Sequence, residues 1–316
     1  GYQFGNLDAT GLYLKPGEVR RITVYVDAED PGKLSVAWRQ VGVTDSNNYP
    51  SLNLEQRSRL VNGANQITVD LTGKTYGSML YLRNDSTDNK ARVRIESADA
   101  PDAEGEPILG TGLGAHPFYE HDPAHPERFW DYVQQVRAHA ARAQAGEAAD
   151  MTLIQMGDAG HAQFAVSATA MAKAYAGIAS EADAVAYIEK SNRAIQDRLE
   201  FYWAFDGFDA GEATGPNAIT TARVHTAFTR TVSSPSTMYA YGRYFHMPES
   251  SAATFLSGES MYGWGMSHEY GHMLDNNVIA VAEETNNLYS IAGARHGGIE
   301  AARAAGTAFN PAAHYH

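Results

Sequence analysis

The sequence predicts an α+β chain of more than one domain, in which a β-sandwich-like domain precedes a mainly helical one. In residues 1–98, apolar and polar residues alternate in short runs between turn-forming residues, which is typical of antiparallel strands. Over residues 108–316 the apolar residues recur mainly at helical spacing, which is typical of packed helices. The segment 99–107 is acidic and rich in Pro and Ala, so we interpret it as a linker.

The strands of the first domain are recognised by strict alternation. The alternating runs are residues 20–26, 34–38, 66–71 and 92–95. Turn signals lie between them, including Pro16-Gly17, Pro31-Gly32 and Asn62-Gly63. Several short strands at this spacing indicate a sandwich or barrel-like domain, which we expect to be an accessory domain.

In the second domain we expect long helices first, and shorter strands and helices after them. The long helices are predicted over residues 125–145 and 180–201, and Ser180 is a suitable N-cap for the second. Short strands are predicted at 160–166, 222–228 and 236–245. A further helix is predicted at 278–292, because Gly293 follows it as a stop signal.

The composition narrows the possible partners. The 316 residues carry a net charge of −13, which argues against nucleic acids and anionic membrane surfaces, because both would repel the chain. No run of 18 apolar residues occurs, so no membrane-spanning helix is expected. There is no cysteine, so disulfides and thiolate ligands are excluded and any metal must be held by His, Asp or Glu.

The strongest signal for function is His268-Glu269-Tyr270-Gly271-His272, an instance of His-Glu-x-x-His. Residues four apart lie on one face of an α-helix, so His268 and His272 can direct both imidazoles at one metal ion. Glu269 lies beside them, where its carboxylate can take a proton from a metal-bound water. The motif therefore predicts a zinc protease, with Zn²⁺ as the cofactor and Glu269 as the general base.

A catalytic zinc takes three protein ligands and leaves a fourth position for water, so one more ligand is needed. In the predicted helix 278–292, Glu283 and Asn287 share one face. We expect Glu283 to be the third ligand and Asn287, one turn further on, to support the site from outside the metal's own ligands. Glu284 lies about 100° round the helix from Glu283 and is the alternative ligand.

Other residues are candidates for contact with the substrate. In zinc proteases the strand beside the motif helix often binds the substrate main chain by strand addition, which makes Tyr241 and Arg243 candidates for the cleft wall. A second group that stabilises the oxyanion is also expected. Tyr289, His296 and the tyrosines of 239–244 are all compatible with that role.

The arrangement of these residues resembles the enhancin-like, mucin-degrading gluzincin zinc metallopeptidases (peptidase family M60). His268-Glu269-x-x-His272 is followed, after residues 273–282, by Glu283 and then by Thr285-Asn286-Asn287-Leu288-Tyr289-Ser290. Gly263-Trp264-Gly265 is similar to the family's segment before the zinc helix, which adds Trp264 to the substrate-side candidates. The chain departs from the family at Glu284, where members often have Val, and this leaves the choice between Glu283 and Glu284 open.

The resemblance implies a gluzincin catalytic domain over residues 108–316 and a secreted or cell-surface bacterial enzyme. It also implies substrates that are mucin-type O-glycosylated proteins. Family members have further helices after the third ligand, so the natural chain is expected to continue beyond His316. The expected function is that of a secreted zinc metalloendopeptidase which cleaves the peptide bonds of O-glycosylated proteins.

Two alternatives to this function stay open. One is a general zinc metalloprotease with no glycan requirement. The other is a non-catalytic glycan-binding module that keeps a zinc site. The intact Glu269 argues against the second alternative, because a site that has lost its activity has no reason to retain the base.

Overall fold

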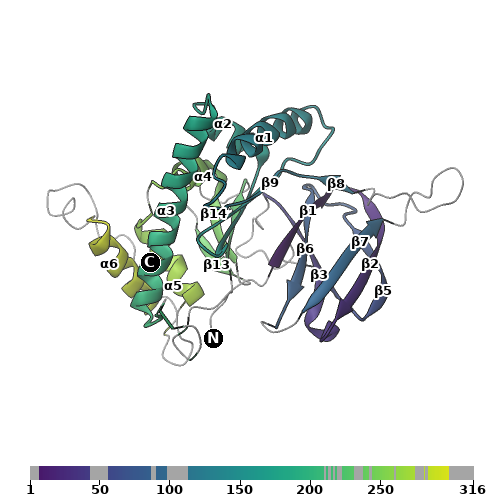
Figure 1. The fold of residues 1–316 in the computed structure, drawn as a ribbon, viewed down its shortest axis with the longest axis horizontal. Helices are drawn as coiled ribbons and strands as arrows, with labels where there is room; N and C mark the ends of the chain where they lie inside the picture. The colour runs from purple at the N-terminus through teal and green to yellow at the C-terminus, as the bar shows by residue number, and fades with distance from the viewer. Residues whose placement is uncertain are drawn as a thin grey trace, which may run out of the picture.

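A computed structural model places most of the chain. It describes residues 7–42, 56–86, 90–97, 113–209, 211–212, 215, 218, 223–230, 238–241, 244–259, 261–274, 281 and 284–298. The helices gather at one end of the molecule and two antiparallel sheets lie at the other, with a six-stranded sheet between them (Figure 1). The α+β class predicted from the sequence is confirmed.

Two antiparallel sheets form the N-terminal part. One has the order β4-β3-β6-β1-β8 and the other the order β5-β2-β7. Their strands are β1 (Leu7–Leu14), β2 (Val19–Ala28), β3 (Leu34–Gln40), β4 (Gln56–Arg59), β5 (Gly63–Asp70), β6 (Ser78–Asn84), β7 (Ala91–Ser97) and β8 (Gly114–Ala115). The sheets share a core of alternating residues such as Ile22, Val24, Val36 and Leu80. The four predicted strands overlap β2, β3, β5 and β7, whereas β1, β4, β6 and β8 were not predicted.

The six-stranded sheet has the order β13-β14-β12-β11-β10-β9. Its strands are β9 (Phe118–Glu120), β10 (Thr152–Met156), β11 (Ala162–Val166), β12 (Val224–Thr229), β13 (Tyr239–Tyr241) and β14 (Tyr244–Pro248). The strands β11, β12 and β14 run parallel to one another, and β13 pairs antiparallel to β14. Every residue of β10, β11 and β14 is buried, so both faces of this sheet are covered.

Alternation shows what covers each face. Ile154, Phe164 and Phe245 belong to the core shared with the helices. Their neighbours Leu153 and Ala165 belong instead to a core shared with β1, β3 and β6. The molecule is therefore layered, with helices, six-stranded sheet, five-stranded sheet and three-stranded sheet in that order. The predicted linker, residues 99–107, lies outside the described residues. Further along the chain, β8 adds a strand to the five-stranded sheet beside β1.

The helices are as follows: α1 (Arg128–Gln144), α2 (Ala168–Ala174), α3 (Glu181–Phe205), α4 (Ala252–Leu256), α5 (Trp264–Leu274) and α6 (Asn286–His296). The two long predicted helices correspond to α1 and α3, and Ser180 caps α3 by accepting a hydrogen bond from the backbone N–H of Asp183. Together with β9–β14, these helices make the second part a sheet that is covered by helices. No helix within the described ranges is long and apolar enough to cross a membrane.

The predicted helix 278–292 is wrong in its bounds. Backbone hydrogen bonds from Glu284 and Thr285 to the carbonyl of Val281 form a turn, and α6 begins only at Asn286 and runs past Gly293 to His296. Gly293 lies inside α6, and a residue without a side chain is needed there because α6 packs closely on α5: a Cβ at Gly293 would lie 2.6 Å from the Ser267 hydroxyl. Close packing therefore explains a glycine that the sequence suggested as a stop.

Candidate metal centre

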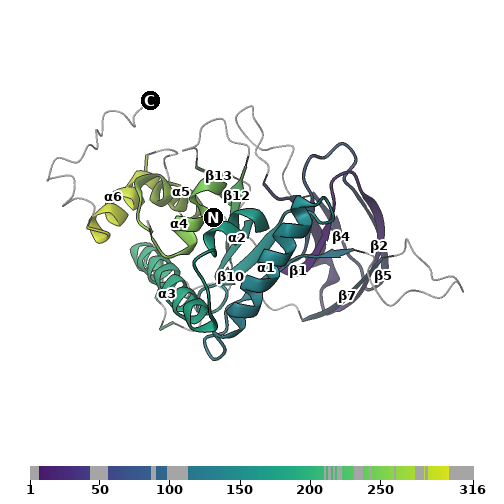
Figure 2. The same ribbon diagram turned by 90° about the horizontal axis from the view of Figure 1, so that it is seen from above.

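The motif residues lie on α5, which lies beside α6 (Figure 2) and is also contacted by Arg198 and Tyr202 of α3. Residues four apart share a helix face, and the rings of His268 and His272 lie 4.9 Å apart between centroids. Both histidines are half-buried, and Glu269 is 8% exposed. The helical spacing expected of His-Glu-x-x-His is therefore present.

A glycine allows α6 to approach α5 at this point. A Cβ on Gly271 would lie 2.7 Å from the Cβ and 2.8 Å from the Cα of Asn286. Such distances are shorter than van der Waals contact, so any side chain at this position would force the two helix backbones apart. The glycine inside the motif thus lets the first turn of α6 lie directly over the two histidines.

The first two residues of α6 both hydrogen-bond to the motif histidines. Asn287 Oδ1 lies 2.8 Å from His268 Nδ1. An amide oxygen only accepts hydrogen bonds, so Nδ1 carries the proton and Nε2 of His268 keeps its lone pair. This is the tautomer that a metal ligand needs, and a hydrogen bond to the other ring nitrogen is how it is usually fixed.

The lone pairs of both histidines converge on one point. Asn286 Nδ2 lies 2.8 Å from His268 Nε2 and 2.9 Å from His272 Nε2. An amide NH₂ has two hydrogens to donate, so both Nε2 atoms act as acceptors toward the same atom. Asn286 Oδ1 is buried and has no hydrogen-bond partner among the described residues.

This donor set fits a zinc ion. Two neutral imidazoles that direct lone pairs at one point are what zinc binds at about 2.0–2.1 Å per nitrogen. Glu283, the expected third ligand, lies outside the described residues, and no cluster of three metal-ligating side chains occurs within them. Glu284 is exposed in the turn before α6. Asn286 was not predicted to contact the histidines.

The far side of α5 is held by a buried cation. Arg198 of α3 is fully buried, and its guanidinium lies 4.2 Å from the centre of the Tyr270 ring and hydrogen-bonds to the Tyr270 hydroxyl. Arg198 also donates to the sulfur of Met266 at 2.9 Å. Met266 and Tyr270 are one turn apart, on the face opposite the histidines. Arg198 therefore fixes α5 from behind.

The strand beside α5 is β13, which is the last strand of the six-stranded sheet as described. Met238, just before it, lies near Gly265 of α5: a Cβ on that glycine would be 3.5 Å from the Met238 sulfur. The backbone of Tyr241 belongs to β13, whereas Arg243 lies outside the described residues. An edge strand next to the motif helix is the position from which strand addition is possible.

The remaining candidates are placed as follows. Tyr289 is buried, and its hydroxyl donates to the Asp206 carboxylate at the end of α3, so it points to α3. Trp264 is half-buried at the start of α5, and its carbonyl accepts from the Ser290 hydroxyl at 3.0 Å. His296 stacks on Phe201 at the other end of α6 from the motif histidines.

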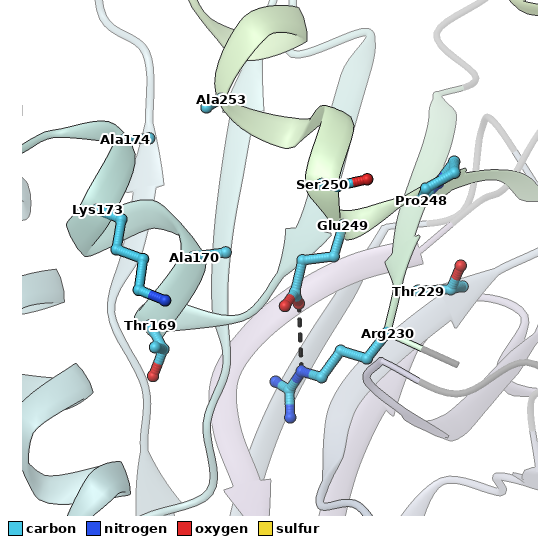
Figure 3. Close-up of a pocket in the computed structure, with 10 residues that line it drawn as sticks. All are labelled: Thr169, Ala170, Lys173, Ala174, Thr229, Arg230, Pro248, Glu249, Ser250 and Ala253. Carbon is cyan, nitrogen blue, oxygen red and sulfur yellow. Dashed lines mark hydrogen bonds and ion pairs between the residues drawn. The ribbon is translucent and has the colours of Figure 1, made fainter. Parts of the chain in front are cut away.

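A separate cavity of about 620 Å³ lies where β12 and β14 end, beside α2 and α4 (Figure 3). Arg230 and Glu249 form an ion pair on one wall, with 3.2 Å between Nε and Oε2, and Lys173 lies on the opposite wall. Neither motif histidine lines this cavity. It is therefore not part of the metal centre.

Comparison with solved structures shows the fold. The chain is similar to the ZmpB metallopeptidase from Clostridium perfringens, with 18% identity and a TM-score of 0.69, over 93% of this chain and 54% of that chain. It is also similar to the catalytic module of the metalloprotease ZmpA from Clostridium perfringens, with 21% identity and a TM-score of 0.69, over 94% and 54%. The M60 catalytic domain of Clostridium perfringens ZmpC, in complex with the sialyl T antigen, matches with 19% identity and a TM-score of 0.66, over 93% and 52%.

The chain spans about half the length of these solved structures. No curated protein matches the sequence. The profile of the family described as Peptidase M60, enhancin and enhancin-like, matches residues 158–316, which is half of the chain and includes α5 and α6. The chain therefore belongs to the M60 metallopeptidase family, whose members carry a catalytic metal, generally zinc.

Proposed function

We propose that the protein is a secreted zinc endopeptidase that hydrolyses peptide bonds of O-glycosylated, mucin-like proteins. The observation that carries this proposal is the convergence of the His268 and His272 Nε2 lone pairs on one point, with Glu269 in the same helix. Zinc held there by His268, His272 and Glu283 would lower the pKa of a water to about 7 and polarise the scissile carbonyl.

Glu269 would act as the general base. Its carboxylate, buried in the motif helix, takes a proton from the attacking water and delivers it to the leaving amine. Asn287 orients His268 through Nδ1, and Gly271 lets α6 approach close enough for that contact. The strand β13, the last of the six-stranded sheet as described, is where an extended substrate would add as a further strand, with Tyr241, Arg243 and Trp264 as candidates for the walls of the cleft.

The glycan part of the proposal rests on the comparison. The similar catalytic domain of ZmpC was solved with the sialyl T antigen, a glycan, and the family resemblance implies secreted or surface enzymes that act on mucin-type proteins. We further propose residues 108–316 as the peptidase domain and residues 1–98 as an accessory domain. The five- and six-stranded sheets share a core, which supports folding of the accessory and peptidase domains as one unit.

The test of the chemistry is Glu269→Gln. The variant loses the base but keeps both imidazoles. It should therefore retain one zinc ion per chain and hydrolyse peptides about 10²- to 10⁴-fold more slowly. The measurement is cleavage of an O-glycoprotein, followed by mass spectrometry, beside metal analysis of the same sample. Undiminished cleavage by the zinc-loaded variant would contradict the assignment.

The test of the substrate is one glycopeptide, offered before and after enzymatic removal of its O-glycan. We expect cleavage next to the glycosylated Ser or Thr only while the sugar is present, and none after chelation. Equal cleavage of both forms would favour the general metalloprotease. Tight binding of the glycopeptide without turnover by zinc-replete protein would favour the non-catalytic module.

A further inference from the structure

A small polar cavity in the N-terminal part concentrates positive charge. It has a volume of about 350 Å³ and lies on the five-stranded sheet. Its ionic side chains are Lys33, Arg57, Arg59, Arg83 and Asp85, so four positive charges and one negative give a local charge of +3. The whole chain, in contrast, carries −13. Four of the 24 Lys and Arg residues therefore line one small cavity, against the overall charge of the protein.

The register of the sheet places the arginines side by side. Ser35 of β3 pairs with Arg59 of β4 on one side and with Arg83 of β6 on the other. Neighbouring strands lie about 4.8 Å apart, so the two arginines flank Ser35 in one row. Arg57 lies two residues from Arg59, on the same face of its strand. The three arginines face one cavity, and an anion bound between them would relieve the repulsion between their like charges.

The row faces away from the core between the two N-terminal sheets. Leu34 and Leu60 point into that core, so their neighbours Ser35 and Arg59 point to the opposite face, because side chains alternate along a strand. Ala37, two residues further along β3, lies on this outer face and is covered by the six-stranded sheet. The cavity therefore lies on the outer face, next to the area that the six-stranded sheet covers.

The arginines differ in how they are held. The Arg83 side chain is 7% exposed, and its Nε donates to Asp85 Oδ1 at 2.8 Å, so it forms a fixed floor. Arg57 and Arg59 are exposed. No hydrogen bond or ion pair joins either of these two side chains to another residue that the structure describes. Their guanidinium groups are therefore available to a ligand.

We propose that this cavity binds a single oxyanion group, the carboxylate or sulfate ester of an acidic sugar. Guanidinium groups bind planar or tetrahedral oxyanions through paired, charge-assisted hydrogen bonds. The volume suits one sugar unit rather than a length of polyanion. None of the described residues that line the cavity is aromatic, so the charge, rather than stacking on a sugar face, would provide recognition. The cavity shares no residue with the metal centre, so the proposal does not depend on peptidase activity.

The experiment is a calorimetric titration of the whole chain, with Glu269→Gln and chelator present so that no cleavage occurs. The probes are sodium sulfate, galactose 6-sulfate, N-acetylneuraminic acid and neutral N-acetylgalactosamine. We expect saturable binding of the anions and none of the neutral sugar. Arg57→Gln with Arg59→Gln should weaken anion binding about tenfold or more for each guanidinium removed, the scale of a charge-assisted hydrogen bond.

The matched control is Arg92→Gln, since Arg92 is an exposed arginine on β7 of the other sheet. It removes one positive charge, as Arg57→Gln or Arg59→Gln alone does, and should leave binding unchanged. Stronger binding of galactose 6-sulfate than of free sulfate would identify the sugar as part of the ligand, whereas equal binding would limit the site to the oxyanion, and both support it. No saturable binding, equal weakening by Arg92→Gln, or an affinity that grows with the length of a heparin or DNA fragment would overturn the proposal.

Discussion

The asparagines at the start of α6 show how much of the site depends on single hydrogen bonds. Position alone suggested Asn287 as a support for the metal ligands, and its Oδ1 does lie 2.8 Å from His268 Nδ1. That contact supports its proposed role. Asn286, whose amide lies between the two Nε2 atoms, could not be foreseen, because a contact between two helices depends on how closely they pack.

Asn287→Ala should weaken zinc binding about 10- to 100-fold, the usual effect of losing such an outer contact. Both neutral tautomers of His268 would then be populated, and in a fraction of the molecules Nε2 would carry the proton and could not bind zinc. The measurement is a competition titration of zinc against a chelator of known affinity. Leu288→Ala is the control, since Leu288 is 53% exposed in the same helix turn. Unchanged zinc affinity in Asn287→Ala would exclude this role for Asn287.

The choice between the two glutamates can be made with one pair of variants. We expect Glu283→Gln to lose zinc and peptidase activity together, because zinc then keeps only two protein ligands. Glu284→Gln should retain both, since Glu284 is exposed in the turn before α6. Zinc content and peptide cleavage are measured on both proteins. The reverse pattern would make Glu284 the ligand.

At the level of the elements, the packing of α6 on α5 depends on Gly271 having no side chain. Gly271→Ala should lower the free energy of unfolding by about 1–3 kcal/mol, as overpacking usually does, and should also reduce zinc affinity. The reason is that the new Cβ would lie 2.8 Å from the backbone of Asn286, and relief moves α6 away from the histidines. Denaturant unfolding and zinc titration measure the two effects.

Gly265→Ala is the matched control in the same helix. Gly265 is exposed, and a Cβ there would meet only the Met238 sulfur at 3.5 Å, which is ordinary contact. Alanine is the better helix former by up to about 1 kcal/mol, so this variant should be as stable as the parent or more so. Equal behaviour of the two alanine variants would show that close packing at Gly271 is not needed.

Helix and strand patterns predicted most clearly the elements that bury one face. The alternation of β2 and the apolar stripe of α3 predicted both elements. No strand was predicted at β10, which is buried on both faces and whose sequence does not alternate, although β11 and β14 are equally buried and overlap predicted strands. Gly293 shows a second limit: a glycine inside a helix and a glycine that ends one look alike until the partner helix is known.

At the scale of the whole molecule, the sequence predicted two domains joined by a linker, and the structure places a shared core between them. Alternation identifies two faces of a strand but does not show which other sheet covers each face. The shared core includes buried polar groups. Arg39 of β3 is 5% exposed, and its Nη2 lies 2.5 Å from Nε2 of His246 on β14. The Arg39 guanidinium carbon lies 3.9 Å from the centre of the Tyr244 ring.

These buried polar groups should make stability depend on pH. Burial, with a smaller contribution from Arg39, lowers the pKa of His225 to about 3, and the pKa of an unfolded histidine is about 6.5. Between these two values the unfolded chain binds a proton that the folded protein does not. The free energy of unfolding therefore has its full value above pH 6.5. Below that, His225 alone lowers it by up to about 1.4 kcal/mol per pH unit as the pH falls toward 3.

The measurement is denaturant unfolding at several pH values from 7.5 to about 4.5, a range set by the unfolded pKa of histidine. His225→Phe keeps a ring between Tyr81 and Tyr244 and cannot be protonated, so its unfolding free energy should fall less steeply with acid. His125→Gln is the control, because His125 is half exposed on the surface and its loss should leave the slope unchanged. If His225→Phe kept the slope of the parent, groups other than His225 would cause the acid sensitivity.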